Sequence, residues 1–346
     1  MNALYVDAHC HLSSDPWTLN HDHVDIKDTI DDVLQNETSS ESKLLLNIMS
    51  TSHLDHVLLK KCNAFFNKHS YKIGIGIHPW YSYMYTFDRN ITKLDHYLSI
   101  LSFDYNEVAK LLNVQVNETG KIEKFIQQLV NKTYQSYPDV YCIDDLYPND
   151  VFFNYDFIGE VGLDFAANVK KIADITSLNE IKVNKDHQVK ILQFFLNKLT
   201  SNLSNLKFIS IHSVKASQAT FDVIKHTDET LQQRNVKANI VLHSYTGTIE
   251  QFNQQYLKLK NINSFISLST FINCKMPLTK KQRKLISSLD TKHMLIETDV
   301  PITTNRMGFK FKENLENTLN VIRNYKKITF EDLRNEINKN YAGIMD

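Results

Sequence analysis

No apolar run in the sequence approaches the roughly 18 residues that a membrane-spanning helix requires, so no membrane partner is expected. Cysteine is scarce too, with 4 residues and no CxxC pair. Scattered cysteines are typical of reduced thiols, and the apolar run that begins at Leu4 leaves no room for a signal peptide. We therefore expect a cytoplasmic or nuclear protein. Neither charge is in excess, with 39 basic and 39 acidic residues, so any contact with nucleic acid must be local.

The remaining composition is that of an ordinary globular protein, with 42% hydrophobic and 23% charged residues. Most of the apolar residues gather in short, continuous, β-prone runs, as expected of parallel strands buried on both faces. The runs are Leu4–Ala8, Leu44–Met49, Tyr71–Ile77, Phe157–Val161, Phe208–Ile211, Asn239–Leu242, Phe265–Leu268 and Met294–Ile296. Eight strands separated mostly by helical patterns predict an α/β protein of one domain, residues 1–346, folded as a (β/α)8 TIM barrel.

Helical periodicity follows most of the runs. It predicts helices over His53–His69, Lys185–Leu199, Ala216–Lys225, Ile249–Leu259, Leu278–Leu289, Lys312–Tyr325 and Phe330–Met345. Thr329 followed by Asp332 is a plausible capping start for the last of these. These helices are the elements that a barrel requires between its strands.

One segment, residues 80–156, breaks the alternation because it separates the third and fourth runs where a single helix would suffice. It contains amphipathic stretches at Leu94–Leu112 and Ile122–Tyr134 and ends in an acidic, aromatic loop, Tyr137–Asp156. We interpret it as a large rim insertion between strands 3 and 4, and as the surface on which a protein partner would bind. The acidic, polar segment Trp17–Ser42 is predicted to be a second rim loop with a short helix.

Residues that can bind metal lie at or beyond the ends of six of the runs. His9 and His11 are one residue apart, and alternate residues of a strand share one side. The others are His78, Glu160 with Asp164, His212, His243, and Glu297 with Asp299. The active site of a barrel enzyme forms at the C-terminal ends of the strands, so we expect these side chains to converge.

Each of these residues alone has an ordinary structural explanation, as a paired core histidine, an ion-pair carboxylate or a turn residue. The joint pattern instead predicts a divalent metal site, with donors that suit Zn²⁺, Mn²⁺, Mg²⁺ or iron. Five or six ligands exceed those that one catalytic zinc takes, which favours two metals. A second His-x-His pair, His21 and His23, follows no strand and is expected to have no role.

Short motifs in the same order resemble the TatD family of metal-dependent hydrolases, which is known for deoxyribonuclease activity. The resemblance spans nearly the whole chain outside residues 80–156 and the first rim loop. The matching motifs are Asp7-Ala8-His9-Cys10-His11-Leu12, Gly76-Ile77-His78-Pro79, Gly159-Glu160-Val161-Gly162-Leu163-Asp164, Ile211-His212-Ser213, His243-Ser244-Tyr245-Thr246-Gly247, Glu297-Thr298-Asp299-Val300-Pro301 and Asn340-Tyr341-Ala342.

This resemblance implies a set of roles for the site. His9, His11 and Asp299 would bind one metal, His212 and His243 the other, and Glu160 would bridge both. The cofactors would be two divalent ions, Mg²⁺, Mn²⁺ or Zn²⁺. The implied reaction is phosphodiester hydrolysis by an exonuclease acting on DNA, with single strands or 3′ ends as candidate substrates. Asp299 would orient or deprotonate the attacking water and, with Glu160, forms the predicted catalytic pair, while His78 would support the ligands or contact phosphate.

Departures from the family pattern affect the substrate-binding residues. Val214 stands where Arg is usual, Trp80 stands where His is frequent, and in the loop Ile302–Phe309 the only cation is Arg306. Two alternatives therefore stay open: a scaffold or partner-binding protein with weak catalysis, and an amidohydrolase-type enzyme for small molecules. Glu160 argues against the second, since many such enzymes use a modified lysine on strand four. The aromatics after His78 are expected to pack residues 80–156 onto the barrel rather than to stack on bases: Tyr81, Tyr83, Tyr85 and Phe87.

Overall fold

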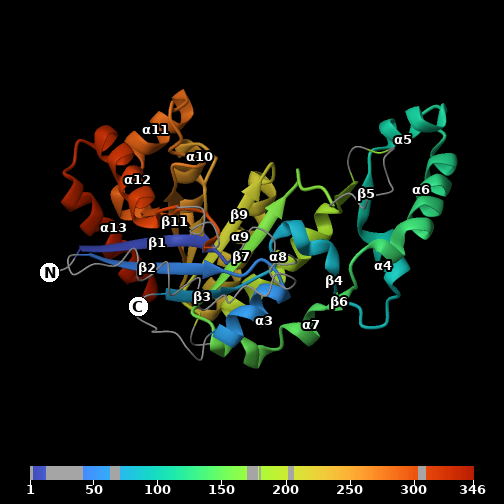
Figure 1. Cartoon of the computed structure of the whole chain (residues 1–346), viewed down its shortest axis with the longest axis horizontal. Helices are drawn as coiled ribbons and strands as arrows, with labels where there is room; N and C mark the ends of the chain where they lie inside the picture. The colour runs from blue at the N-terminus through green and yellow to red at the C-terminus, as the bar shows by residue number, and fades with distance from the viewer. Residues whose placement is uncertain are drawn as a thin grey trace.

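The computed structural model describes residues 3–12, 42–62, 71–169, 178, 181–201, 206–302 and 309–346. Parallel strands form one eight-stranded sheet in the order β1-β2-β3-β7-β9-β10-β11-β12, with helices around it (Figure 1). The strands are β1 (Ala3–His11), β2 (Ser42–Met49), β3 (Tyr71–Ile75), β7 (Phe157–Asp164), β9 (Ile209–Val214), β10 (Ala238–Leu242), β11 (Ile262–Leu268) and β12 (Met294–Ile296). Each predicted run corresponds to one of these strands.

The sheet closes on itself where β1 meets the residues that follow β12. The backbone N–H of Asp299 donates to the carbonyl of His9 at 2.9 Å, and the N–H of His11 donates to the carbonyl of Val300 at 3.1 Å. The predicted (β/α)8 barrel is therefore confirmed. All eight strands end at one rim, where the loops between strands and helices meet.

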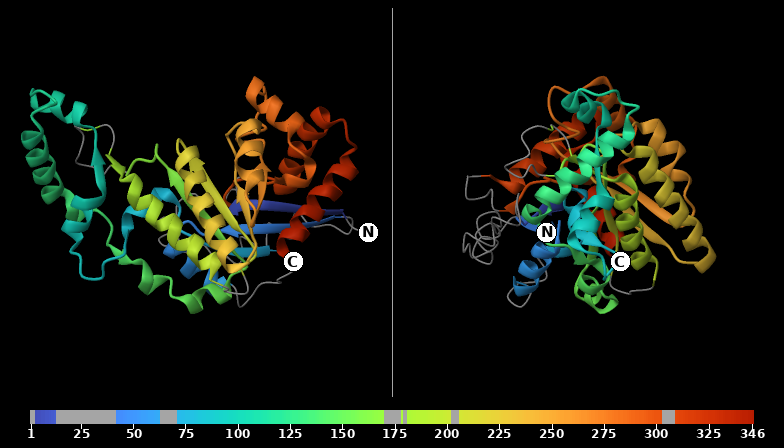
Figure 2. Two further views of the ribbon diagram at one scale, coloured as in Figure 1. Left: turned by 180° about the vertical axis from the view of Figure 1, so that it is seen from behind. Right: turned by 90° about the vertical axis from the view of Figure 1, so that its right-hand side faces the viewer.

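Helices cover the outside of the barrel (Figure 2). They are α3 (His53–Cys62), α8 (Lys185–Thr200), α9 (Ser217–Arg234), α10 (Ile249–Gln254), α11 (Lys280–Ser288), α12 (Phe311–Lys326) and α13 (Phe330–Met345). The hydroxyl of Thr329 accepts the N–H of Asp332 at 3.1 Å and caps α13, as predicted. The side-chain amide of Asn340 donates to the carbonyls of Thr291 and Met294, which fixes α13 against β12. In the part of the chain that the structure describes, no helix is both long and apolar enough to cross a membrane.

Several element bounds differ from those expected. β3 ends at Ile75, two residues earlier than predicted, because the N–H of His78 turns away to the carbonyl of Thr51 at 2.8 Å. α9 runs past the predicted end, and it stops where Asn235 takes a left-handed conformation with φ 54°. The part of the first predicted helix beyond Cys62 lies outside the described residues, and so do residues 17–41 of the predicted rim loop.

Residues 79–156 form a series of short elements between β3 and β7. They are the 3₁₀ turn η1 (Pro79–Met84), β4 (Tyr85–Thr86), α4 (Lys93–Ile100), β5 (Leu101–Phe103), α5 (Tyr105–Leu112), α6 (Thr119–Thr133), η2 (Tyr134–Ser136), β6 (Tyr141–Cys142), α7 (Ile143–Leu146) and η3 (Asn149–Asn154). The amphipathic stretch Leu94–Leu112 forms most of α4 and all of α5, with β5 between them; β5 pairs with β8 (Ile181–Val183). Figure 1 shows α4, α5 and α6 standing to one side of the barrel.

Both ends of this segment contribute to the barrel's core. Tyr85 is fully buried, and its hydroxyl accepts the backbone N–H of His53 at 2.9 Å. Phe152 is also fully buried, with its ring 6.1 Å from that of Phe195 on α8. The expectation that the aromatics pack inward therefore holds for Tyr85 and its buried neighbours, while Phe87 is 39% exposed. The division of the chain at residues 80 and 156 stays a prediction.

The inside of the barrel is filled by a separate apolar cluster. Its members come from alternate positions of the strands, which face inward. The rings of Phe157 and Phe208 stack at a centroid distance of 4.6 Å, and Tyr341 and Ile344 of α13 join the same cluster. The barrel is thus a packed core beneath the rim and not a pore.

Gly162 allows a close approach between β7, which carries Glu160, and β9, which carries His212. Gly162 of β7 has φ 154°, and a Cβ atom built on it would lie 2.0 Å from the carbonyl oxygen of His212 on β9. No side chain fits there without a backbone shift. The close approach keeps His212 next to β7.

We expect Gly162→Ala to lower the melting temperature and to weaken metal binding, because the added methyl would push β9 away from β7. Overpacking of this kind costs about 1–3 kcal/mol. Thermal unfolding by circular dichroism, with a metal titration, measures both effects. Gly343→Ala is the control, since that Cβ meets open space in α13 and the change should stabilise by about 0.5–1 kcal/mol. Equal melting of both variants would contradict the argument.

Candidate metal centre

The six predicted ligands come together at the C-terminal rim of the barrel. They are His9 and His11 of β1, Glu160 of β7, His212 of β9, His243 directly after β10, and Asp299 beyond β12. His9, Glu160 and His243 are buried, and the other three are partly open. These five strand ends therefore meet at one point, as the polar residues at the ends of the buried runs predicted.

Glu160 lies at the centre of this cluster, and its two carboxylate oxygens face different histidines. Oε2 is 3.3 Å from Nε2 of His9 and 3.3 Å from Nε2 of His11. Oε1 is 2.7 Å from Nδ1 of His212 and 3.2 Å from Nε2 of His243. The carboxylate therefore separates the imidazoles into two sets.

Asp299 completes the set on the side of β1. Its Oδ1 lies 3.2 Å from Nε2 of His11 and 3.8 Å from Nε2 of His9. Donor atoms fall into three triplets that could each hold an ion: His9 with His11 and Asp299, His9 with Glu160 and His243, and His78 with Glu160 and His212. Imidazole and carboxylate donors with no thiolate suit Zn²⁺, Mn²⁺ or Mg²⁺.

His78 is a fifth imidazole of the cluster. Its Nε2 lies 3.3 Å from Oε1 of Glu160 and 3.3 Å from Nδ1 of His212. From the sequence, His78 is expected to support the ligands or to contact phosphate. Its Nε2 lies close enough to Glu160 and His212 for the three residues to hold one ion together, and it comes from the strand end after β3 that the sequence pattern had singled out.

Charge in the cluster favours bound cations. Burial acts to raise the pKa of Glu160, but the imidazoles of His78 and His243 outweigh it and hold that pKa well below its usual range. Burial lowers the pKa of His78 to about 4, although the charge of Glu160 acts to raise it. The pKa of His243 is raised well above its ordinary value, against burial, because Asp299 and Glu160 favour its charged form. The buried carboxylates are therefore stabilised by positive charge. Divalent cations would supply that charge in place of the protons on the imidazoles.

Glu297 supports the cluster; the sequence grouped it with the residues expected to converge at the rim but gave it no role of its own. Its Oε1 accepts the backbone N–H of Ser244 at 2.8 Å and the hydroxyl of Ser244 at 2.7 Å, and it lies 3.3 Å from Nδ1 of His243. A carboxylate behind a ligating imidazole fixes the tautomer and orientation of the ring. The signal in the sequence was its place directly after the last strand, two residues before Asp299.

Asp7 has a similar supporting role at the seam of the barrel. It is fully buried, and burial raises its pKa to about 7 although Thr298 lowers it by hydrogen bonding. Its carboxylate accepts the N–H of His9 at 3.1 Å, the N–H of Thr298 at 3.0 Å and the hydroxyl of Thr298 at 2.6 Å. Asp7 therefore positions both His9 and the segment that carries Asp299.

Above the cluster lies an open cavity of about 460 Å³. It is lined by His11, Thr51, His78, Trp80, Tyr81, Glu160, Asp164, His212, Val214, His243, Ile272, Asp299 and Pro301. In this lining, among the described residues, there is no lysine or arginine. His21, His23 and Arg306 lie outside the described residues.

A closed (β/α)8 barrel with histidines and carboxylates gathered at the C-terminal rim defines a barrel enzyme of the metal-dependent hydrolase class. The chain belongs to the TatD-related DNase family, whose model matches residues 6–346. The family resemblance of the motifs is thereby confirmed, and with it the prediction of a metal-dependent hydrolase that acts on ester bonds.

Individual relatives agree with this assignment. The chain is 31% identical over 309 residues to an uncharacterized deoxyribonuclease of Saccharomyces cerevisiae, covering 87% of this chain and 85% of the relative. It is 26% identical over 170 residues to an uncharacterized metal-dependent hydrolase of Methanocaldococcus jannaschii, covering 48% of this chain and 61% of the relative.

Two solved structures share the fold. A hydrolase TatD family protein from Entamoeba histolytica matches with a TM-score of 0.55 and 13% identity, over 99% of this chain and 98% of that chain. An uncharacterized amidohydrolase from Saccharomyces cerevisiae matches with a TM-score of 0.56 and 15% identity, over 99% of both chains. At these identities the likeness establishes the architecture alone.

We expect Glu297→Gln to weaken metal binding about 10- to 100-fold while the protein stays folded, because the amide keeps the shape but not the charge behind His243. Isothermal titration with Zn²⁺ or Mn²⁺ measures the affinity. Glu250→Gln is the matched control, since Glu250 is exposed and pairs with Lys284 on the surface, away from the cluster. Unchanged affinity in Glu297→Gln would show that His243 needs no carboxylate partner.

Proposed function

We propose that this chain is a two-metal phosphodiesterase that hydrolyses DNA as an exonuclease. The observation that carries the proposal is the position of Glu160, one carboxylate whose two oxygens face separate sets of imidazoles. A carboxylate in that position suits a bridge between two cations. Membership of a DNase family supports a nucleic acid as the substrate.

The donor atoms suit two divalent ions. His9, His11 and Asp299 would hold one ion and His212 and His243 the other, with Glu160 shared and His78 within reach of the second. Such ions lower the pKa of a coordinated water and neutralise charge on a phosphoryl group. We propose Mg²⁺, Mn²⁺ or Zn²⁺.

We propose that Asp299 accepts a hydrogen bond from the attacking water and orients it. Burial raises its pKa, but His243 and His11 outweigh that effect and hold the pKa at about 2, so the carboxylate is ionised at neutral pH. Its side chain lines the cavity and is 21% exposed, so a water bound there is within its reach. Asp299 would accept a hydrogen bond from that water and orient it toward phosphorus.

Substrate phosphate meets few fixed positive charges in this cavity. Val214 lines it at the end of β9, and its aliphatic side chain makes no charge-assisted contact. Losing one such contact costs about 1.5–3 kcal/mol, which is about a ten- to a hundredfold loss of rate. We therefore propose a slow, metal-dependent enzyme.

Glu160→Gln is expected to lower the occupancy of both metal sites and to abolish cleavage, because the amide keeps the size of the bridge but removes its charge. Metal content per chain by mass spectrometry, with cleavage of an end-labelled single-stranded DNA, measures both. Glu123→Gln, an exposed carboxylate on α6, is the matched control. Two metals per chain with full activity in Glu160→Gln would rule out the bridging role.

Val214→Arg should raise kcat/KM on DNA about ten- to a hundredfold, because the guanidinium can enter the cavity and pair with phosphate. Initial rates at one fixed salt concentration provide the measurement. Val57→Arg adds the same charge at an exposed position of α3, so it controls for general attraction of DNA. An equal gain in both variants, or none in Val214→Arg, would count against a missing phosphate contact.

A further inference from the structure

A second cavity opens beside the one above the metal centre. Its volume is about 310 Å³, within the about 300–1,000 Å³ that small-ligand sites span. The two cavities share three lining residues, Trp80, Tyr81 and Asp164, and are therefore adjacent. A ligand that reaches the metal centre through the larger cavity passes directly by the smaller one.

Trp80 lines both cavities and is held in place by residues of the candidate metal centre. Its Nε1–H donates to Oδ2 of Asp164 at 2.7 Å, and Nε2 of His212 lies 3.5 Å from the same oxygen. Its backbone N–H donates to Nδ1 of His78 at 3.1 Å, and the two rings meet edge to face at 4.8 Å. The orientation of the indole is thus coupled to His78 and His212.

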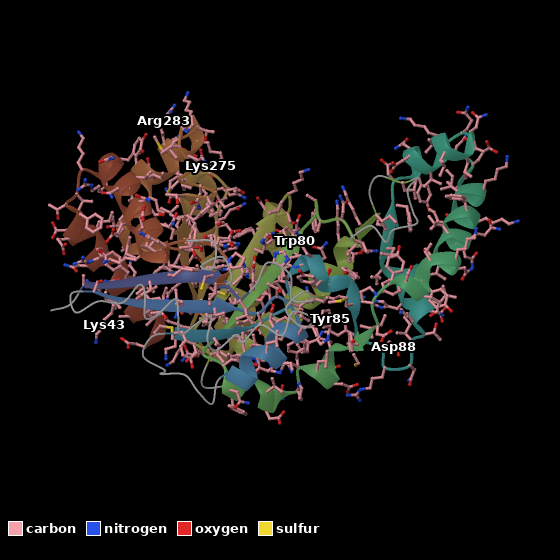
Figure 3. The ribbon with its side chains drawn as sticks, viewed as in Figure 1. Lys43, Trp80, Tyr85, Asp88, Lys275 and Arg283 are labelled. Atoms are coloured by element: carbon pink, nitrogen blue, oxygen red, sulfur yellow. The ribbon has the colours of Figure 1, made fainter. Side chains whose placement is uncertain are left out.

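Despite these contacts the indole is 53% exposed, more than any other large aromatic side chain in the part of the chain that the structure describes. Figure 3 shows Trp80 near the middle of the molecule, between α11 and the segment that carries α4 to α6. A rigid, half-exposed aromatic ring loses little conformational freedom on stacking, which favours a flat, aromatic ligand.

The residues that line the smaller cavity suit a nucleobase better than a phosphate group. Its other lining residues are Tyr83, Ala166, Ala167 and Asn168, so aromatic, small and amide groups line it. Within the described lining there is no cation, and Asp164 would repel an anion. A neutral, planar group with hydrogen-bonding edges fits these surroundings.

We propose that Trp80 is the nucleobase-stacking residue of this enzyme, and that the smaller cavity receives the base of the nucleotide next to the scissile phosphate. This inference rests on the proposed function, because it assumes that the phosphate of a nucleotide lies at the metal centre. It makes Trp80 a determinant of substrate recognition. Stacking tolerates every base, so little sequence preference is expected.

Binding tests the inference without catalysis. The chain has 2 tryptophans, so Trp17→Phe leaves Trp80 as the only indole. In this variant of the metal-loaded protein, deoxyadenosine 5′-monophosphate should quench the fluorescence saturably. Deoxyribose 5-phosphate, which has the same phosphate and sugar but no base, should bind about five- to 150-fold more weakly, as measured by competition with the nucleotide. Equal binding of the two ligands would overturn the proposal.

Kinetics supply the second test. Trp80→Ala should lower kcat/KM about five- to 150-fold on single-stranded DNA, but leave kcat/KM within about twofold on the same strand with an abasic terminal nucleotide. Trp80→Phe should restore most of the activity on normal DNA, because it keeps a stacking surface. Phe87→Ala is the matched control, an aromatic that is 39% exposed on the same segment and lines neither cavity.

The outcomes separate this inference from the proposed function. If Trp80→Ala loses activity equally on normal and abasic strands, Trp80 only positions His78 or Asp164 and the stacking role fails. If the wild-type protein cleaves both strands with the same kcat/KM, the stacking role fails while the nuclease stands. If the wild type shows base-dependent quenching but cleaves no DNA, the nuclease fails while the base site stands.

Discussion

The structure depends on one buried carboxylate. Glu160 lies among five imidazoles that come from four other strand ends. An ionised carboxylate in a buried site is costly unless positive charge surrounds it. Here the imidazoles around Glu160 provide that positive charge when they are protonated. The strands must therefore be positioned so that their ends bring these imidazoles to the carboxylate.

The glycines of the barrel show how the backbone allows this arrangement. A Cβ on Gly76 would meet the backbone oxygen of Glu160 at 2.5 Å, and one on Gly162 would meet His212. Strands β3 and β9 therefore approach β7 more closely than strands with side chains at these positions allow. His78 and His212 consequently both reach Oε1 of Glu160, at 3.3 and 2.7 Å.

Sequence alone could predict the barrel and the gathering of histidines and carboxylates at its rim, because both depend on local signals. Buried parallel strands are short apolar runs, and candidate ligands such as His243 and Asp299 lie just beyond their ends. The supporting contacts could not be predicted, since they join residues far apart in the chain: Glu297 reaches His243, and Trp80 bonds to Asp164. The pairing of β5 with β8 escaped prediction for the same reason, because nothing local in Leu101–Phe103 specifies a partner.

The seam of the barrel has a consequence for the synthesis of the protein. Nε2 of His11 and Oδ1 of Asp299 meet across 288 positions of sequence, and Asp7 binds Thr298 across 291. During translation Asp7 and His11 leave the ribosome early. Thr298 and Asp299 follow only when most of the chain has been made. A nascent or truncated chain therefore lacks one side of the centre, and the hydrolytic site assembles only once the last strand has closed the barrel.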